Sequence, residues 1–331
     1  MEIGGGGATA EPQTPAAEET QHDLPAAEGG VNPVELLEGH KHADVFRWVY
    51  NLDDTTTETS LEPMKLWHET EYGGAAACSQ KVGCPMLQIF SLKLTSLPPS
   101  SADSPVQLYG FMAVRDPLDP LRNYVFNRSR DDPFVIHDLQ SDPFIYLSGP
   151  KRGVFMQRYV LLEYDMKVKR GEQHAEHDDL PLVHGVAIFS LPMRSDRAVS
   201  NRITGCHGAA LEISRSLIAN AAQATVQVWV TDLNGGNGRI DLSITASISK
   251  VAGEIKVFRG VVDRPCELNR FVFAVGSGCC LFLKFQVPGG SDNYLNLFAF
   301  GASAHGFIRD RRELDFATVD VKVTWSSLYD R

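Results

Sequence analysis

The stretch Val160–Lys169, with the sequence VLLEYDMKVK, decides the fold class. Its apolar side chains alternate with mostly polar ones, as in a strand that has one buried face and one solvated face. The same period of two occurs at Val226–Thr231 and at Val319–Ser326. No amphipathic helix of ordinary length interrupts this pattern after Met86. We therefore predict an all-β body, built as an antiparallel β-sandwich.

The body can be divided in two ways. The polar stretch 170–180 (RGEQHAEHDDL) offers a boundary between halves 86–170 and 182–329, and each half contains a D-x-K-V strand near its end. Alternating sequences resemble each other by chance. One large β domain and two tandem sandwiches are therefore both open.

The region before the body differs in composition. Residues 1–31 are rich in Gly, Ala, Pro and Glu and contain no aromatic residue, so we predict a disordered acidic tail. Asn32 and Pro33 read as the N-cap and first position of a short helix that extends to Tyr50. The predicted organisation is a tail at 1–31, a short helix and extended connector at 32–85, and the β body at 86–329.

The charge is unevenly distributed along the 331 residues. The net charge is −10, and residues 1–45 account for −8 of it, which leaves −2 for the rest. Such a body lacks the basic surface that duplex DNA or an anionic membrane attracts. The sequence has no run of about 18 apolar residues and no secretory signal at its start. We expect a soluble cytoplasmic or nuclear protein with reduced cysteines and a protein partner, rather than DNA or a membrane span.

Four stretches of the body are distinctive: CPMLQIFS at 84–91, YGFMAVRD at 109–116, RNYVFNRSRDD at 122–132 and LSGP at 147–150. Together they resemble the plant domain-of-unknown-function family 6598, much expanded in grasses, over Cys84–Leu328. That family has no established activity. The resemblance implies a stress or defence setting, because some relatives carry the domain beside a ribosome-inactivating rRNA N-glycosylase domain. The Glu-Ala-x-Arg pattern of that glycosylase does not occur here, so the resemblance implies no depurinating activity.

The segment 115–132 (RDPLDPLRNYVFNRSRDD) is the candidate binding site. Guanidinium groups bind carboxylates and phosphates through paired hydrogen bonds, which favours a recognition loop. The alternative is that its arginines and aspartates pair with each other and cap the turns at Pro117 and Pro120. The candidate binding residues are Arg115, Asp116, Arg122, Asn127, Arg128, Arg130 and Asp131.

We predict no metal, cofactor or catalytic residue. The body holds enough aspartates for a calcium site, but the arginines among them repel the cation, so we do not expect calcium or phospholipid binding. The polar stretch His174–Asp179 is expected to be solvated. Neither Cys206–His207 nor Gly276–Gly278 has the surroundings of an activated nucleophile. The aspartates considered as calcium ligands are Asp116, Asp119, Asp131, Asp132, Asp138 and Asp142.

The leading hypothesis is a non-catalytic β-sandwich interaction module of a plant family associated with stress or defence. It contacts a protein partner through the segment 115–132. Two alternatives come from other classes: an accessory domain related to rRNA N-glycosylase proteins, and an enzyme whose site is assembled from residues distant in sequence.

Overall fold

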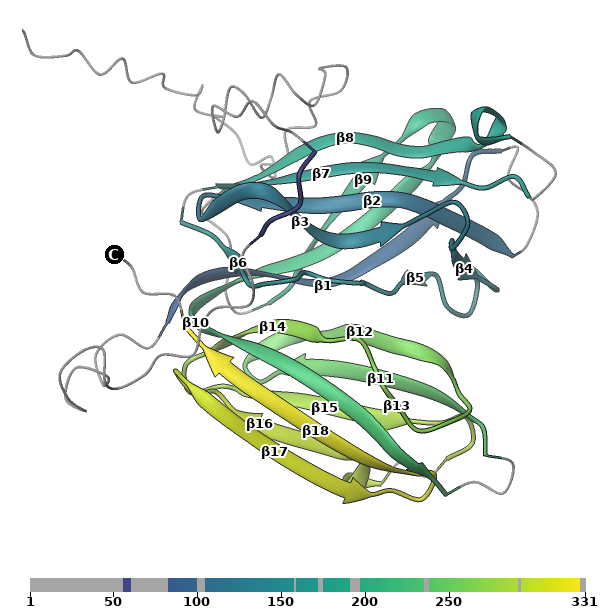
Figure 1. Ribbon diagram of the computed structural model, residues 1–331. Coiled ribbons are helices and arrows are strands. Elements are labelled where there is room, and N and C mark those ends of the chain that lie inside the picture. The colour runs from purple at the N-terminus through teal and green to yellow at the C-terminus, as the bar shows by residue number, and fades with distance from the viewer. Residues whose placement is uncertain are drawn as a thin grey trace, which may run out of the picture. The chain divides into compact units, whose positions relative to one another are not determined.

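The computed structural model confirms the all-β prediction, with antiparallel strands arranged in three sheets (Figure 1). The structure describes residues 56–60, 83–99, 105–157, 159–171, 175–190, 197–234, 238–290 and 293–327. The predicted tail at 1–31 and the predicted helix up to Tyr50 lie outside the described residues. The short 3-10 helices of the described part are η2 (Glu176–Asp178), η3 (Cys206–Gly208) and η4 (Tyr294–Asn296).

A five-stranded sheet contains the stretch that decided the fold class. Its strands run in the order β3-β2-β7-β8, and β4 pairs with β2. The alternating stretch up to Val168 lies in β7, whose even-numbered side chains, such as Leu162 and Met166, are buried in a hydrophobic core. The strands of this sheet are β2 (Val106–Asp116), β3 (Asp119–Arg128), β4 (Phe134–Ile136), β7 (Tyr159–Val168) and β8 (Leu180–Ser190).

A nine-stranded sheet and a four-stranded sheet complete the body. The nine-stranded sheet follows the order β17-β18-β10-β1-β5, with β6 on β1 and with β9, β13 and β14 on β10. Its strands are β1 (Cys84–Ser96), β5 (Phe144–Ile145), β6 (Val154–Phe155), β9 (Val199–Thr204), β10 (Ala210–Leu233), β13 (Cys266–Glu267), β14 (Phe271–Gly276), β17 (Gly306–Glu313) and β18 (Ala317–Ser326). The four-stranded sheet has the order β12-β11-β15-β16, with β11 (Ile240–Ile248), β12 (Val251–Val262), β15 (Cys280–Gln286) and β16 (Leu297–Gly301).

The nine-stranded sheet takes part in two hydrophobic cores. In the N-terminal sandwich, β1, β9 and the first part of β10 pack against the five-stranded sheet. In the C-terminal sandwich, the rest of β10, with β14 and β18, packs against the four-stranded sheet. The 24-residue strand β10 runs through both, and its side chains change core between Leu217 and Ile218. Both sandwiches belong to one compact unit.

Strand β1 lies between the two cores. Leu87 and Ile89 point into the N-terminal core, whereas Met86 and Phe90 point into the C-terminal core. A strand that is buried on both faces needs apolar side chains at consecutive positions, which explains the run Met86–Phe90. The exception, Gln88, is buried, and its amide oxygen accepts a hydrogen bond from the backbone N–H of Ala274 at 2.8 Å.

The polar stretch 170–180 connects β7 to β8, and these two strands pair with each other along the five-stranded sheet. The change from one core to the other occurs along β1 and β10. The assignment of 86–170 and 182–329 as separate domains stays a prediction.

Candidate functional site

The segment 115–132 forms the end of β2, a tight hairpin, all of β3 and the beginning of the loop that leads to β4. The hairpin closes where Asp116 pairs with Asp119 across Pro117 and Leu118. Because proline sets the backbone for a tight turn and aspartate accepts bonds from nearby N–H groups, this local sequence favours a hairpin. The candidate residues therefore lie on two antiparallel strands and a loop, where they can point in different directions.

Arg115 and Arg122 share one carboxylate. Two nitrogens of Arg115, Nε and Nη2, bond to Glu163 Oε2 at 3.2 and 3.0 Å. Arg122 Nε bonds to the same oxygen at 2.9 Å, and its Nη2 bonds to Oε1 at 2.5 Å. The side chains of Arg115 and Glu163 are 0% exposed, and that of Arg122 is 12% exposed. This triad joins β2, β3 and β7, and its buried charges are occupied within the fold.

Asp116 is also buried and holds the hairpin from inside. Its carboxylate accepts bonds from Arg152 Nη1 at 2.7 Å and Nη2 at 3.1 Å. It also accepts the backbone N–H groups of Leu118 at 3.0 Å and Phe155 at 2.9 Å. A carboxylate with this many donors fixes the turn and is inaccessible to a partner.

Arg130 pairs with Asp179, which follows η2. Arg130 Nε bonds to Asp179 Oδ2 at 2.6 Å, and the hydroxyl of Tyr109 donates to the same oxygen at 2.8 Å. Burial alone raises the pKa of Asp179, but hydrogen bonds from Arg130, from the backbone N–H of Arg170 and from Tyr109 lower it to about 2. Burial and the neighbouring carboxylate raise the pKa of Tyr109.

We expect the Asp179 carboxylate to make stability sensitive to acid. Its folded pKa lies below the ordinary value of 3.8, so it stabilises the fold above that value and loses its effect as the pH falls toward 2. Between about pH 5 and pH 2, protonation of Asp179 should cost the native chain about 2 kcal/mol of unfolding free energy. The variant Asp179→Asn should lack this part of the pH dependence. Urea unfolding at several pH values measures this loss, with Asp178→Asn, whose side chain is 42% exposed, as the control. An unchanged pH slope in Asp179→Asn would contradict the assignment.

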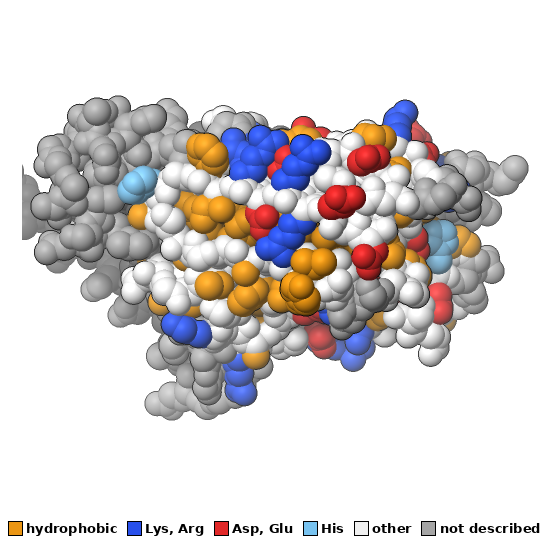
Figure 2. Space-filling view, turned by 90° about the horizontal axis from the view of Figure 1, so that it is seen from below, with side chains coloured by type: hydrophobic (Ala, Val, Ile, Leu, Met, Phe, Trp, Pro, Cys, Tyr) orange, Lys and Arg blue, Asp and Glu red, His pale blue; other side chains and the backbone are white. Residues whose placement is uncertain are grey.

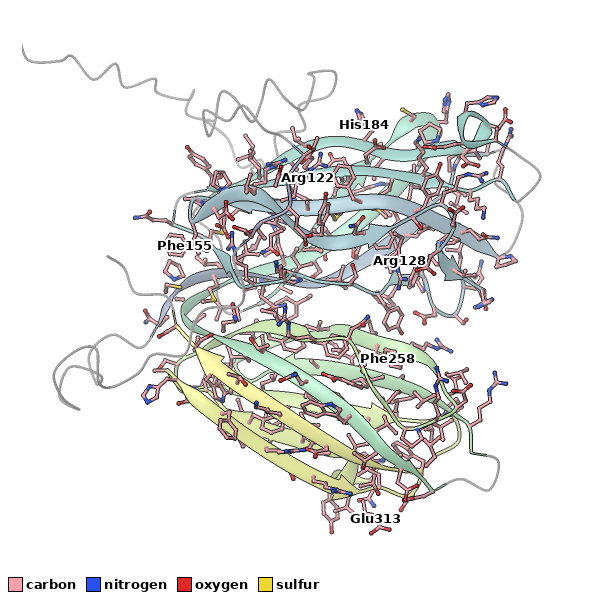
Figure 3. The ribbon with its side chains drawn as sticks, viewed as in Figure 1. Arg122, Arg128, Phe155, His184, Phe258 and Glu313 are labelled. Carbon is pink, nitrogen blue, oxygen red and sulfur yellow. The ribbon has the colours of Figure 1, made fainter. Side chains whose placement is uncertain are left out.

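The remaining candidates lie at the surface. Asn127 and Asp131 are exposed, and Arg128 pairs with Asp132 at 2.7 Å, with side chains 35% and 76% exposed. Figure 3 shows Arg122 in the middle of β3 and Arg128 at its end, close to β4. The structure thus brings Arg115 and Arg122 together, gives Asp116 and Arg130 separate partners, and leaves three candidates accessible.

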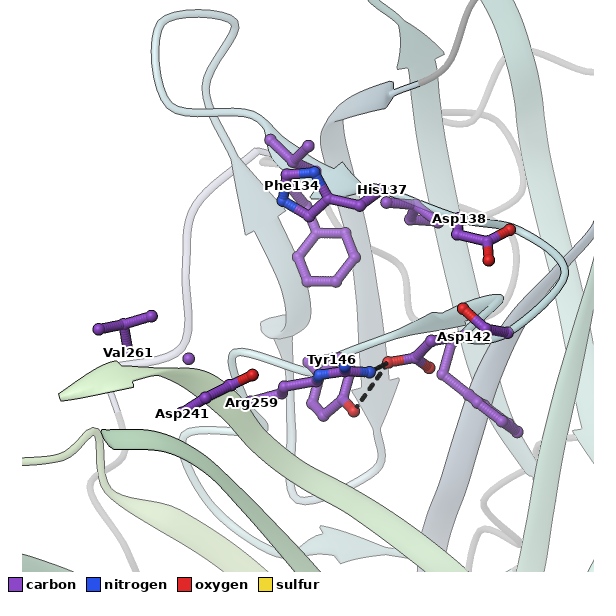
Figure 4. A pocket seen from close by; sticks show the side chains of 13 residues that line it. Phe134, His137, Asp138, Asp142, Tyr146, Asp241, Arg259 and Val261 are labelled. Carbon is purple, nitrogen blue, oxygen red and sulfur yellow. Dashed lines mark hydrogen bonds and ion pairs between the residues drawn. The ribbon is translucent and has the colours of Figure 1, made fainter. Parts of the chain in front are cut away.

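A cleft lies between the two sandwiches (Figure 4). No short sequence motif marks its position. Two adjoining cavities of about 340 Å³ each form it. One wall is the segment 134–146, which includes β4 and β5, and the other is formed by residues of β11 and β12 together with residues 286–288 at the end of β15. The loop after the candidate segment therefore leads directly into this inter-sandwich cleft.

An ion pair joins the two walls of the inter-sandwich cleft. Arg259 Nη1 bonds to Asp142 Oδ2 at 2.5 Å, and the Tyr146 hydroxyl donates to the same oxygen at 3.3 Å. Burial and the charge of Asp142 raise the pKa of Tyr146 to about 12, so its phenol stays protonated at neutral pH. Arg259 is 50% exposed, and Lys256 lies 5.5 Å from the Phe144 ring. The walls thus combine accessible charge with aromatic surface.

A second surface carries exposed apolar side chains. It lies on η4, β16 and β17, where Tyr294 is 80% and Phe307 is 62% exposed. Glu313, at the end of β17, is at the bottom of Figure 3. Figure 2 shows the molecule from below, with apolar side chains scattered among basic and acidic ones. Arg309 on this surface is paired with Asp320, with Arg309 Nη2 2.5 Å from Asp320 Oδ2.

Within the described residues, no three His, Cys, Asp or Glu side chains gather as a metal site would require. Asp116 and Asp119 lie at the hairpin, whereas Asp138 and Asp142 line the inter-sandwich cleft. His174 lies outside the described residues. The described part of the chain also contains no helix long and apolar enough to cross a membrane.

Comparisons with known proteins place the chain in a family. Among solved structures, human GIVD cytosolic phospholipase A2 is similar at 8% identity and a TM-score of 0.24, over 76% of this chain. This chain spans only 31% of that phospholipase chain. The calcium-bound pair of C2 domains of Extended-Synaptotagmin 2 is similar at 10% identity and a TM-score of 0.23, over 75% of this chain and 99% of that one. No curated protein sequence matches the chain. The family model described as a domain of unknown function (DUF6598) matches residues 86–323, and the chain therefore belongs to this family.

Proposed function

We propose that this chain is a non-catalytic module that binds a protein partner in a plant stress or defence setting, and that the inter-sandwich cleft is its recognition surface. One observation carries the proposal. The cleft presents an accessible Arg259–Asp142 pair beside exposed apolar side chains, with Val135 36% and Val261 50% exposed. Arginine and tyrosine next to apolar surface are the residue types that dominate the energy of protein interfaces.

The contrast with the buried charges supports this surface. Arg115, Asp116 and Glu163 are buried and occupied by partners within the chain, so binding to them would require breaking these buried ion pairs. Arg259 can contact a partner without unfolding, because half of its side chain already faces solvent. We include Asn127, Arg128 and Asp131 as the rim of the surface, because the chain runs from them into β4.

The buried acids Asp116, Glu163 and Asp179 are held in ways that suit a structural role better than a catalytic one. A general acid or base works best with a pKa near the operating pH. Asp179 has the opposite property, since its pKa of about 2 keeps it ionised at any physiological pH. Asp116 and Glu163 accept several charged hydrogen bonds each, which suits a structural part.

We expect peptides that bind the chain to depend on the cleft. A phage-displayed library of random linear peptides is selected on the full chain, and the affinity of each selected peptide is measured by fluorescence anisotropy. Arg259→Ala and Val261→Asp should each weaken binding about tenfold or more, because each removes a central contact of the surface.

Matched controls exist on the β17 surface. Arg309→Ala removes an exposed arginine that is also paired with an aspartate, and Ile308→Asp places a charge at an apolar position that is 42% exposed. Both controls should leave binding unchanged. If the peptides bind both cleft variants with the affinity of the native chain but bind the control variants more weakly, the recognition surface lies on β17 and the assignment of the cleft is wrong.

A further inference from the structure

The outer edge of β3 already carries a short extended segment. Glu58 forms a parallel bridge with Arg122, although the two residues are far apart in sequence. The backbone N–H of Thr59 donates to the carbonyl of Arg122 at 2.8 Å, and the N–H of Arg122 donates to the carbonyl of Thr57 at 3.0 Å. Since β3 is the end strand of its sheet, residues 56–60 lie along the edge of that sheet and pair with it through this single bridge.

Side chains add chemical selectivity to this pairing. The hydroxyl of Thr59 donates to Asp119 Oδ2 at 2.5 Å. Lys151 Nζ donates to the carbonyl of Thr59 at 3.3 Å. Thr59 is only 2% exposed, whereas Thr57 and Glu58 are exposed. The edge therefore engages the backbone of Thr57 and Thr59, on either side of Glu58, and the hydroxyl of Thr59.

The groups that receive this segment are held in place by the body itself. The side chain of Arg122 is fixed by Glu163 and lies 4.2 Å from the Phe111 ring centre. The backbone N–H of Lys151 bonds to Asn123 Oδ1 at 2.9 Å. Asp119 Oδ1 accepts the N–H of Leu121 at 3.3 Å. The receiving edge is thus preorganised, which reduces the entropy lost when an extended segment binds.

We propose that the β3 edge at Arg122 is a binding site for an extended segment of a partner protein that has Thr or Ser at the position of Thr59, and that residues 56–60 occupy this site within the same chain. Strand addition supplies affinity through backbone hydrogen bonds and specificity through a side-chain contact. Here the specific contact is a hydroxyl donating to the Asp119 carboxylate, which Val at the same position cannot make. The site is separate from the inter-sandwich cleft.

The test uses the full chain and a fluorescent synthetic peptide with the sequence of residues 54–62. The variant Thr59→Pro removes both the N–H and the hydroxyl of the resident segment and so releases it. The peptide should bind Thr59→Pro about tenfold more tightly than the native chain, where the resident segment competes at high effective concentration. A peptide with Val in place of Thr59 should bind that variant about tenfold more weakly, because the charged hydrogen bond is lost.

Three controls make the outcome decisive. Glu58→Gln changes an exposed neighbour and should bind the peptide as the native chain does. Thr59→Val provides a milder release in case Thr59→Pro does not fold, as judged by its circular-dichroism melting curve. Arg259→Ala should leave peptide binding unchanged, so that the proposal for the β3 edge and the proposal for the cleft are tested independently. Absence of peptide binding to the folded released variant, or equal affinity of the Thr and Val peptides, would overturn the proposal.

Discussion

Replacing Glu163 with Gln should lower the free energy of unfolding by about 3–5 kcal/mol. The substitution keeps the shape of the side chain but leaves the guanidinium groups of Arg115 and Arg122 without their shared carboxylate. Arg115 is 0% exposed and cannot recover its hydration without disrupting the fold. An uncompensated buried charge of this kind is among the largest single-residue effects on stability. Urea unfolding of the purified full chain measures the loss.

The matched control is Arg128→Ala, which breaks the exposed pair with Asp132. Pairs exposed to this degree contribute about 0–1 kcal/mol, so this variant should unfold close to the native midpoint. A Glu163→Gln variant that is as stable as Arg128→Ala would show that the triad contributes little and that these arginines are available for other roles.

Gly110→Ala should also be strongly destabilising. Gly110 lies within β2 at a φ of +101°, a region that side chains other than hydrogen disfavour. A Cβ there would lie 2.2 Å from the carbonyl oxygen of Asp165 on β7, so the two strands would have to separate. Backbone strain of roughly 1–3 kcal/mol and overpacking of roughly 1–3 kcal/mol together predict a loss of about 2–6 kcal/mol.

Gly306→Ala separates these two contributions. Gly306 has a similar φ of +88°, but no described atom lies within 4 Å of its ideal Cβ. Its substitution should therefore show the backbone strain alone. Thermal unfolding followed by circular dichroism compares the two variants. Equal destabilisation by both would mean that the close approach of β2 and β7 at Gly110 is absent.

Alternation made most of the fold predictable from the sequence. The stretch from Val160 to Val168 lies within β7, and the stretch from Val319 to Ser326 lies within β18. Each of these strands has one face in a core and the other face pointing away from the core, so apolar and polar side chains alternate along the strand. The absence of long helices from the described body follows from the same pattern.

The sharing of one sheet by two cores could not be predicted in this way. The run Met86–Phe90 is apolar on both faces, which is compatible with several kinds of buried element. Only the long-range pairing of β1 with β10 shows that its two faces serve different cores. Likewise, no local signal in β10 marks the point between Leu217 and Ile218 where its side chains change core.

The partners of the charged segment were equally hidden. Among the described residues, Arg128–Asp132 is an ion pair within the segment 115–132. The other ion pairs described for this segment use Arg152, Glu163 and Asp179, which lie 36 to 49 positions away in sequence. Charge patterning predicts that charges will pair, but it does not identify the partner when that partner comes from another strand. The sequence thus located the charged cluster without separating its buried members from its exposed ones.

The inter-sandwich cleft was missed because its two walls are distant in sequence. Arg259 and Asp142 are 117 positions apart, and neither lies in a recognisable motif. A weak signal was present in β12, where the exposed Val261 directly precedes the buried Val262 and interrupts the alternation. Such an interruption indicates an apolar side chain on the outer face of a sheet, which is a feature of interaction surfaces.

Hydrogen–deuterium exchange of the full chain, with and without a selected peptide, tests the recognition surface most directly. If the inter-sandwich cleft binds the partner, the peptide should slow exchange in residues 134–146 and 256–261, which form the two walls. Exchange at β17 and at the buried triad should not change. Slower exchange confined to β16 and β17, with both cleft walls unaffected, would contradict the account.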